Sequence, residues 1–284
     1  MMIILRTDNM IQDIAPHFLS NQYHNYLPED EDILLVCSPL GVLIFEGDRL
    51  RFPTVAQCRS LVEIEQLKYL FAIDDTRYFL YFMESASEDI VGFTYRKMND
   101  IRAMRDNVKI LAAATGWHLY TWYRNHQYCG RCGKKVVPDR HLRALNCPEC
   151  GNMIFPVIAP AVIVAVTNGD KILLTKYANR AYTRFALIAG FTEIGESAEQ
   201  TVAREVMEEA GLKVKNIRYY KSQPWGFDSN LLLGFFCEVD GDETITMDDE
   251  ELAVAQWVHK SDIPEYEEGL ALTHEMMMFF KNMD

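Results

Sequence analysis

The sequence predicts a mixed α/β protein built in three parts. These are a β-rich domain with a connecting helix at residues 1–125, a short four-cysteine segment at 126–156 and an α/β domain at 157–284. Three observations carry this prediction. Short apolar runs separated by turn residues recur through the first 97 residues. Two closely spaced cysteine pairs follow, and strand and helix patterns then alternate to the end of the chain.

Composition excludes several classes of protein. Of the 284 residues, 49% are hydrophobic and 24% are charged, which is ordinary for a globular protein and excludes a mainly disordered chain. The net charge of −13 argues against a protein that coats nucleic acid, but permits an anionic substrate if a metal ion neutralises the site. The longest apolar stretch, 155–166, is interrupted by prolines and is too short for a membrane span, and the start lacks a secretion signal. We therefore expect a cytoplasmic protein without membrane contact.

The first domain shows strand patterns and no catalytic constellation. The expected strands are Ile33–Cys37, Gly41–Phe45, Tyr69–Ile73 and Tyr78–Met83. The helical pattern that follows, from Met98 to Gln127, has a glycine at Gly116 that should weaken it near its middle. We expect a structural or dimerising role for this domain.

The last domain opens with a hairpin. Pro160–Tyr177 forms two expected strands around Asn168-Gly169, a strong turn signal. Further strands are expected at Arg184–Ile188, Ile217–Ser222, Asn230–Val239 and Ala253–Val258, with helices at Ser197–Ala210 and Leu270–Asn282.

The cysteine pairs have the spacing of a metal site. Cys129 and Cys132 form one CxxC pair, and Cys147 and Cys150 form the other. Four thiolates complete a closed tetrahedral Zn²⁺ site with no position left for water, so the zinc would be structural. A glycine follows each pair and can adopt a positive φ that turns backbone N–H groups toward the sulfurs. The rival interpretation is a redox pair, which would need only one CxxC. Nearby basic residues also leave a nucleic-acid role open for this segment.

An acidic helix follows. Ser197 and Gln200 form a capping-box pattern at its start, and Gly211 stands where a helix ends. Glu205, Glu208 and Glu209 are related by i, i+3 and i, i+4, so their carboxylates share one face. Such a face can be a solvated surface. Hard oxygen ligands at this density also suit Mg²⁺ or Mn²⁺.

The stretch from Gly190 to Leu212 resembles the Nudix box, G-x5-E-x7-R-E-U-x-E-E-x-G-U, where U is aliphatic, and every fixed position matches. The resemblance implies a Nudix fold, with a mixed β-sheet between helices, and hydrolysis of a nucleoside diphosphate linked to another group. It implies that Glu205, Glu208 and Glu209 bind the metal. Among these we expect substitution of Glu209 to reduce catalysis most. The positions that it implies to be structural are Gly190, Glu196, Arg204 and Gly211, with an ion pair joining Glu196 to Arg204.

A second motif narrows the resemblance. Residues 222–229, Ser-Gln-Pro-Trp-Gly-Phe-Asp-Ser, are similar to the SQPWPFPxS motif of the NADH pyrophosphatase family of Nudix hydrolases. The order of β-rich domain, zinc ribbon and Nudix domain agrees with that family. Gly226 and Asp228 replace two family prolines, which makes the loop less rigid and adds a negative charge.

The same resemblance implies further site residues. Glu251 matches a late metal-binding glutamate, with Glu250 as its alternative. The positions that match substrate contacts are Phe155, Phe191, Gln223, Trp225 and Thr273. Phe191 matches an aromatic residue that stacks on the substrate across a dimer interface, so we expect a homodimer. The alternative for each phenylalanine is core packing, and the alternative for Gln223 and Trp225 is a structural role in the loop.

Together these features predict a metal-dependent NAD(H) diphosphatase that uses catalytic Mg²⁺ or Mn²⁺ and structural Zn²⁺. NADH or NAD⁺ would be cleaved to nicotinamide mononucleotide and AMP. The alternatives are removal of the NAD cap from RNA 5′ ends, hydrolysis of another nucleoside diphosphate such as ADP-ribose, and an inert zinc-ribbon binding protein. No GxGxxG fingerprint follows a strand, which counts against a dehydrogenase.

Overall fold

A computed structural model describes residues 10–47, 49–83, 92–178, 184–266 and 270–283. The chain divides into two compact units. One contains Asp13–Ile158 and Gly226–Ser229, and the other contains the described residues up to Gln12 together with Ala159–Trp225 and the chain from Asn230 onward. Among the described residues, no helix has the length and apolar character needed to cross a membrane.

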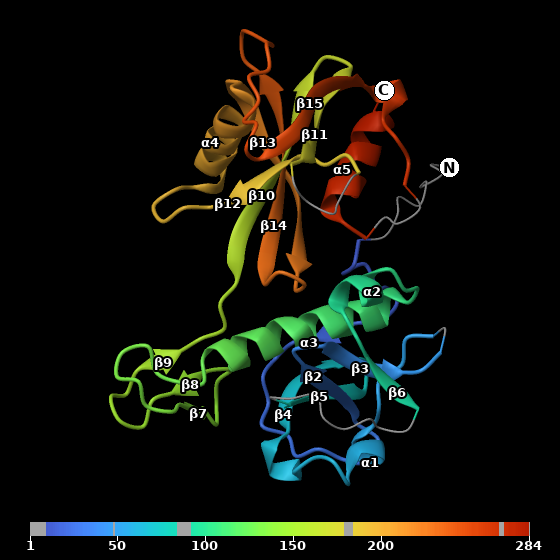
Figure 1. Cartoon of the computed structure of the whole chain (residues 1–284), viewed down its shortest axis with the longest axis vertical. Helices are drawn as coiled ribbons and strands as arrows, with labels where there is room; N and C mark the ends of the chain where they lie inside the picture. Colours follow the sequence, from blue (N-terminus) through green and yellow to red (C-terminus); the bar gives the residue numbers. More distant parts are fainter. Residues whose placement is uncertain (1–9, 48, 84–91, 179–183, 267–269, 284) are drawn as a thin grey trace. The chain divides into compact units, whose positions relative to one another are not determined.

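The first unit is built on a six-stranded sheet in the order β1-β4-β5-β2-β3-β6 (Figure 1). Neighbouring strands are antiparallel except β2 and β5, which are parallel. Its strands are β1 (Leu19–Ser20), β2 (Ile33–Ser38), β3 (Gly41–Phe45), β4 (Lys68–Ile73), β5 (Thr76–Phe82) and β6 (Phe93–Arg96). The four strands expected from the sequence are present within one or two residues.

Successive side chains of β2 point to opposite faces of the sheet, and both faces are packed. Leu34 and Val36 pack with the short helix α1 (Val55–Cys58). Leu35 points to the other face, where a side chain on Gly116 of helix α3 (Asn107–Asn125) would lie 2.3 Å from Leu35 Cδ1. We expected Gly116 to weaken the helix near its middle, and α3 continues through this residue without a break. Gly116 lets α3 lie close against the sheet.

The expected helix 98–127 is in fact two helices. Helix α2 (Met98–Arg102) ends before α3 begins, and Asp106 caps α3 by accepting a hydrogen bond from the Lys109 N–H at 3.1 Å. Asp106 has a φ of 114°, a backbone angle that a continuous helix cannot contain. Beyond α3 lies a small antiparallel sheet of β7 (Val137–Pro138), β8 (Leu145–Asn146) and β9 (Met153–Ile154).

The second unit has a mixed sheet in the order β13-β14-β10-β11-β15, with β12 also paired to β10. Strands β10 and β14 are parallel and the other pairs are antiparallel. The strands are β10 (Ala159–Asn168), β11 (Lys171–Tyr177), β12 (Ile188–Phe191), β13 (Val214–Trp225), β14 (Asn230–Val239) and β15 (Leu252–His259).

Two helices cover this sheet, α4 (Ala198–Ala210) on one face and α5 (Leu272–Lys281) on the other (Figure 1). Val202 and Val206 of α4 join the core formed by Val162, Val164 and other strand residues. On the α5 face, Leu272 and Met276 close over Gly234. The expected arrangement of a mixed sheet between helices is therefore confirmed. Two strands differ most from the expectation: β12 (Ile188–Phe191) begins where the expected strand Arg184–Ile188 ends, and β13 runs from Val214 to Trp225 rather than from Ile217 to Ser222.

Candidate active site

Helix α4 begins and ends at the residues that the sequence marks. The Ser197 side chain accepts a hydrogen bond from the Gln200 N–H at 3.3 Å, and the Gln200 side chain accepts one from the Ser197 N–H at 2.8 Å. At the other end Gly211 adopts a left-handed conformation with φ 68° and its N–H donates to the Met207 carbonyl. These caps fix which residues face the preceding loop.

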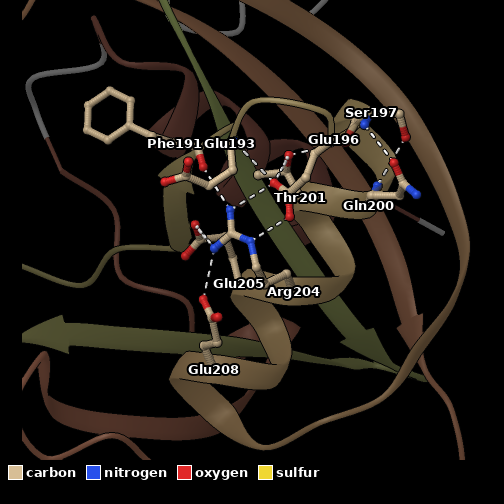
Figure 2. Close-up of polar contacts among 9 residues, drawn as sticks. All are labelled: Phe191, Glu193, Glu196, Ser197, Gln200, Thr201, Arg204, Glu205 and Glu208. Carbon is tan, nitrogen blue, oxygen red and sulfur yellow. Dashed lines mark hydrogen bonds and ion pairs between the residues drawn. The ribbon is translucent and has the colours of Figure 1, made fainter.

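Arg204 is the centre of the polar network on this helix (Figure 2). Its Nε donates to Glu196 Oε1 at 2.7 Å, and its Nη1 donates to both Glu205 Oε1 at 2.7 Å and Glu208 Oε2 at 2.8 Å. Its Nη2 donates to the Phe191 carbonyl oxygen at 2.9 Å. The guanidinium therefore ties the loop before the helix to two of the three helix carboxylates.

Arg204 favours the ionised form of both Glu196 and Glu205, but the net pKa shifts of these two carboxylates have opposite signs. Hydrogen bonding from Arg204 lowers the pKa of Glu196 to about 2, so this side chain remains ionised. Burial raises the pKa of Glu205, and the charges of Glu208 and Glu251 add to the rise while Arg204 opposes it. The carboxylate of Glu205 is thus partly desolvated in the folded protein.

Glu205 lies directly over Gly190 of β12. A side chain on Gly190 would place its Cβ 1.9 Å from Glu205 Cδ and 2.0 Å from Oε1. The first glycine of the box therefore leaves room for a carboxylate, a reason that the linear pattern does not reveal.

The remaining acidic residues differ in exposure. Glu209 is 2% exposed, whereas Glu208 is exposed on the same helix. Glu251 lies close enough to Glu205 for its charge to raise the pKa of Glu205. The backbone N–H of Glu250 donates a hydrogen bond to the Asp248 side chain, two residues before it. Arg204 holds the carboxylates of Glu205 and Glu208 adjacent, and carboxylate oxygens are the ligands that Mg²⁺ and Mn²⁺ prefer. Among the described residues, however, no three carboxylates converge as the cysteine sulfurs do.

The four cysteines form a second candidate metal site. Their Sγ atoms all lie within 4.8 Å of one another, the one such ligand group found among the described residues. Gly133 and Gly151 have φ values of 73° and 69°, and their N–H groups donate to the carbonyls of Cys129 and Cys147. Both glycines have the positive φ that we expected, and the two halves repeat the same turn. Four convergent sulfurs fit structural zinc.

The residues predicted to contact substrate are placed very differently from one another. Phe191 is 54% exposed and its backbone is held by Arg204. Trp225 is 8% exposed and Thr273 lies in the first turn of α5, in the same unit as Phe191. Phe155 is 54% exposed and belongs to the other unit.

Gln223 is fully buried, and both atoms of its amide are engaged. Its Nε2 donates to the Leu270 carbonyl at 2.7 Å, and its Oε1 accepts from the Leu272 N–H at 2.7 Å. Gln12, far away in sequence, donates to the Ser222 carbonyl at 3.1 Å and accepts from Gln223 Nε2 at 3.3 Å. Gln223 therefore holds the start of α5, in agreement with the structural alternative that we gave for it. The sequence could not identify its partners, because they are backbone groups 47 and 49 residues away.

Known proteins resemble the second half of this chain. Residues 157–276 match the NUDIX domain family, and residues 124–155 match the NADH pyrophosphatase zinc ribbon domain. Proteins called NAD-capped RNA hydrolase NudC from Escherichia coli strains O1:K1 / APEC and SMS-3-5 / SECEC are each 44% identical over 152 residues. The match covers 54% of this chain and 59% of the length of those relatives.

Among solved structures, a NUDIX hydrolase from Nitrosomonas europaea is 23% identical with a TM-score of 0.47, over 55% of this chain and 90% of that one. The two family matches adjoin each other and contain the cysteine site and the helix carboxylates described above. The chain therefore carries a Nudix domain preceded by an NADH pyrophosphatase zinc ribbon domain.

Proposed function

We propose that this protein is a metal-dependent diphosphatase that hydrolyses the diphosphate bridge of NADH or NAD⁺. The observation that carries the proposal is the pair of α4 carboxylates organised by Arg204, in a chain that also matches a zinc ribbon of the NADH pyrophosphatase type. Water adds to one phosphorus, the bridging P–O bond breaks, and the products are AMP and nicotinamide mononucleotide. NAD(H) is consumed as a substrate.

Glu205, Glu208, Glu209 and Glu251 are the residues that would hold Mg²⁺ or Mn²⁺. When bound, such ions neutralise charge on the diphosphate and lower the pKa of a bound water. Arg204 keeps Glu205 and Glu208 adjacent, since one Nη1 atom contacts both. Glu209 is held in a buried position on the same helix, so its loss should affect turnover most.

The position of Phe191 supports a role for this residue in substrate binding and in dimerisation. An aromatic ring that is 54% exposed offers a π-face to a nicotinamide or adenine ring. Its backbone is fixed by Arg204, so the ring is presented from a rigid position. We propose that it completes the site of a second subunit in a homodimer. Four thiolates that serve as zinc ligands fit a reducing compartment, which supports a cytoplasmic location.

A second substrate form is favoured by the relatives, which are named for hydrolysis of NAD-capped RNA. The same chemistry would release the cap from an RNA 5′ end, because the diphosphate bridge is unchanged. ADP-ribose is a further candidate, since Gly226 and Asp228 depart from the family motif.

The test is a chromatographic product assay. Purified protein is incubated with NADH, NAD⁺, ADP-ribose or NAD-capped RNA, each with Mg²⁺ or Mn²⁺. Glu209→Gln should abolish turnover while the protein stays folded. Glu199→Gln, an exposed glutamate on the first turn of the same helix, is the matched control and should retain activity.

Each outcome has a distinct meaning. AMP and mononucleotide from NAD(H) support the proposal, and relative kcat/KM ranks the free dinucleotide against the capped RNA. Cleavage of ADP-ribose alone would redirect the assignment to that substrate. No product from any substrate would favour an inert zinc-ribbon binding protein, and unchanged turnover in Glu209→Gln would overturn the role of Glu209.

A further inference from the structure

Charge is distributed very unevenly along this chain. Residues 124–155 contain six Lys or Arg and two Asp or Glu, a formal charge of +4, whereas the whole chain carries −13. The rest of the protein is therefore strongly acidic. A zinc ion with four thiolates has a formal charge of −2, so the ribbon remains positive even after that charge is included.

The first half of the ribbon gathers much of this charge on one small loop, which we call the first knuckle (residues 128–135). A β-bridge between Tyr128 and Lys135 closes it, and the Cys129 N–H donates to the Lys134 carbonyl at 2.8 Å. Arg131, Lys134 and Lys135 are all exposed on this loop. Three cations within five residues of a closed turn must lie near one another.

These three cations form no ion pair within the part of the chain that the structure describes. The Cys129 sulfur accepts from the Arg131 backbone N–H at 3.4 Å and lies 3.7 Å from the donating Asn152 amide nitrogen. Backbone and amide groups thus serve this thiolate, and the cationic side chains remain available to a partner.

Arg143, in the same ribbon, differs from these cations because its guanidinium is bound inside the protein. Its Nη2 donates to the Leu70 carbonyl and to Asn21, and its guanidinium lies over the Tyr23 ring. Burial lowers its pKa. The first knuckle has the opposite character: it is open, since a Cβ on Gly130 or Gly133 would meet no atom within 4 Å.

The knuckle also presents an aromatic ring. Tyr128 is 63% exposed and is bridged to Lys135. Cations that neutralise phosphates, beside a ring on which a base can stack, are the two elements of sequence-tolerant single-strand binding. The second knuckle, with Pro148 and Glu149 between its cysteines, has neither element.

We propose that the first knuckle binds the phosphate backbone of single-stranded RNA, and so selects capped RNA over the free dinucleotide. This inference rests on the proposed function in its capped-RNA form. The knuckle would add affinity for the RNA body, while the reaction at the diphosphate would depend on the carboxylates of the other unit. Binding to it would weaken steeply with salt, because each neutralised phosphate of a single strand contributes about −0.7 to the slope of log K against log salt.

The experiment separates RNA binding from catalysis. The probe is an uncapped, fluorescein-labelled 12-nucleotide single-stranded RNA, and anisotropy titrations are run between 50 and 200 mM salt. The test variant is Lys134→Gln/Lys135→Gln in the full chain. The matched control is Lys97→Gln/Arg105→Gln, which removes the same charge from exposed positions elsewhere in the same unit. Zinc content is measured for each, and single substitutions replace the double variant if it loses zinc.

We expect the test variant to bind several-fold more weakly at low salt, with a salt slope shallower by about 1.4, the share of two phosphate contacts. Its KM for NAD⁺ should be unchanged and its KM for NAD-capped RNA raised. Equal binding by the test and control variants would overturn the proposal, as would failure of the native protein to bind the RNA. Equal competition by duplex RNA or polyglutamate would also overturn it. Failure of the NAD⁺ assay with intact RNA binding would instead count against the proposed function.

Discussion

The carboxylate carbon of Glu205 lies over the α-carbon of Gly190, so that a methyl group added there would sit 1.9 Å from it. Two positions of the box that are separated by a loop and half a helix are therefore mutually dependent. The strand cannot carry a side chain unless the carboxylate moves.

Gly190→Ala should consequently damage activity more than folding. Displacing the Glu205 carboxylate by about 1 Å is expected to lower kcat/KM on the order of 100-fold. The measurement is NADH hydrolysis together with thermal unfolding. Gly130→Ala, at a glycine with open space around it, is the control and should behave as the native protein does. Full activity in Gly190→Ala would contradict the role given to this contact.

Gln223→Leu should loosen the start of α5. The substitution leaves the Leu272 N–H without its acceptor in a buried position, at a cost of about 1–3 kcal/mol in the free energy of unfolding. Hydrogen exchange at Leu272 should accelerate, and Gln12→Ala should accelerate it to a smaller degree. Gln256→Leu, at an exposed glutamine of β15, is the control. Unaltered exchange at Leu272 would mean that Gln223 acts elsewhere, for example on substrate.

Cys129→Ser should reduce zinc from one ion per chain to none. Loss of a structural metal belongs to the most destabilising class of changes, about 4 kcal/mol or more. Zinc content by atomic emission and the unfolding midpoint are the measurements. Cys237→Ser, at a buried cysteine outside the ribbon, should keep the zinc. One zinc per chain in Cys129→Ser would show that the ligand set is wrong.

The Glu196–Arg204 pair predicts a pH dependence of stability. The pKa of Glu196 is lowered from 4.5 to about 2 in the folded protein, so its contribution is fully present above about pH 4.5 and is lost as the pH falls toward 2. The free energy of unfolding of the native protein, minus that of Glu196→Gln, should be constant near neutral pH and shrink below pH 4.5. A difference that stays constant down to pH 2 would contradict the pair's contribution.

The features that could be predicted from the sequence are those written in local patterns. The capping box of Ser197 and Gln200, the stop at Gly211 and the hairpin at Asn168-Gly169 each depend on residues a few positions apart. The two knuckle glycines could be predicted for the same reason. Propensity and short-range hydrogen bonding suffice for all of them.

The features that could not be predicted depend on contacts distant in sequence. The sequence marks Gly116 only as a weak point of a helix, and its close approach to Leu35 is visible only in the structure. For Gln223 the sequence leaves substrate contact and a structural role open, and its distant backbone partners reveal the structural one. Arg143 appears to be one more surface cation of the ribbon, yet it is bound to the Leu70 carbonyl. Only tertiary structure separates it from Lys134 and Lys135.

The division of the chain between its two units has a consequence for biosynthesis. Ile11 is fully buried in the unit that contains α4, and its N–H donates to the Leu270 carbonyl, although about 150 residues of the other unit are made before the chain returns to this unit. At about 5–20 residues per second, the first segment waits roughly 7–30 s on the ribosome for the next part of its unit. The ribbon-bearing unit also needs Gly226–Ser229 from late in the chain. Each unit therefore combines segments that are made at well-separated times, and neither can become native before its later segment has been made.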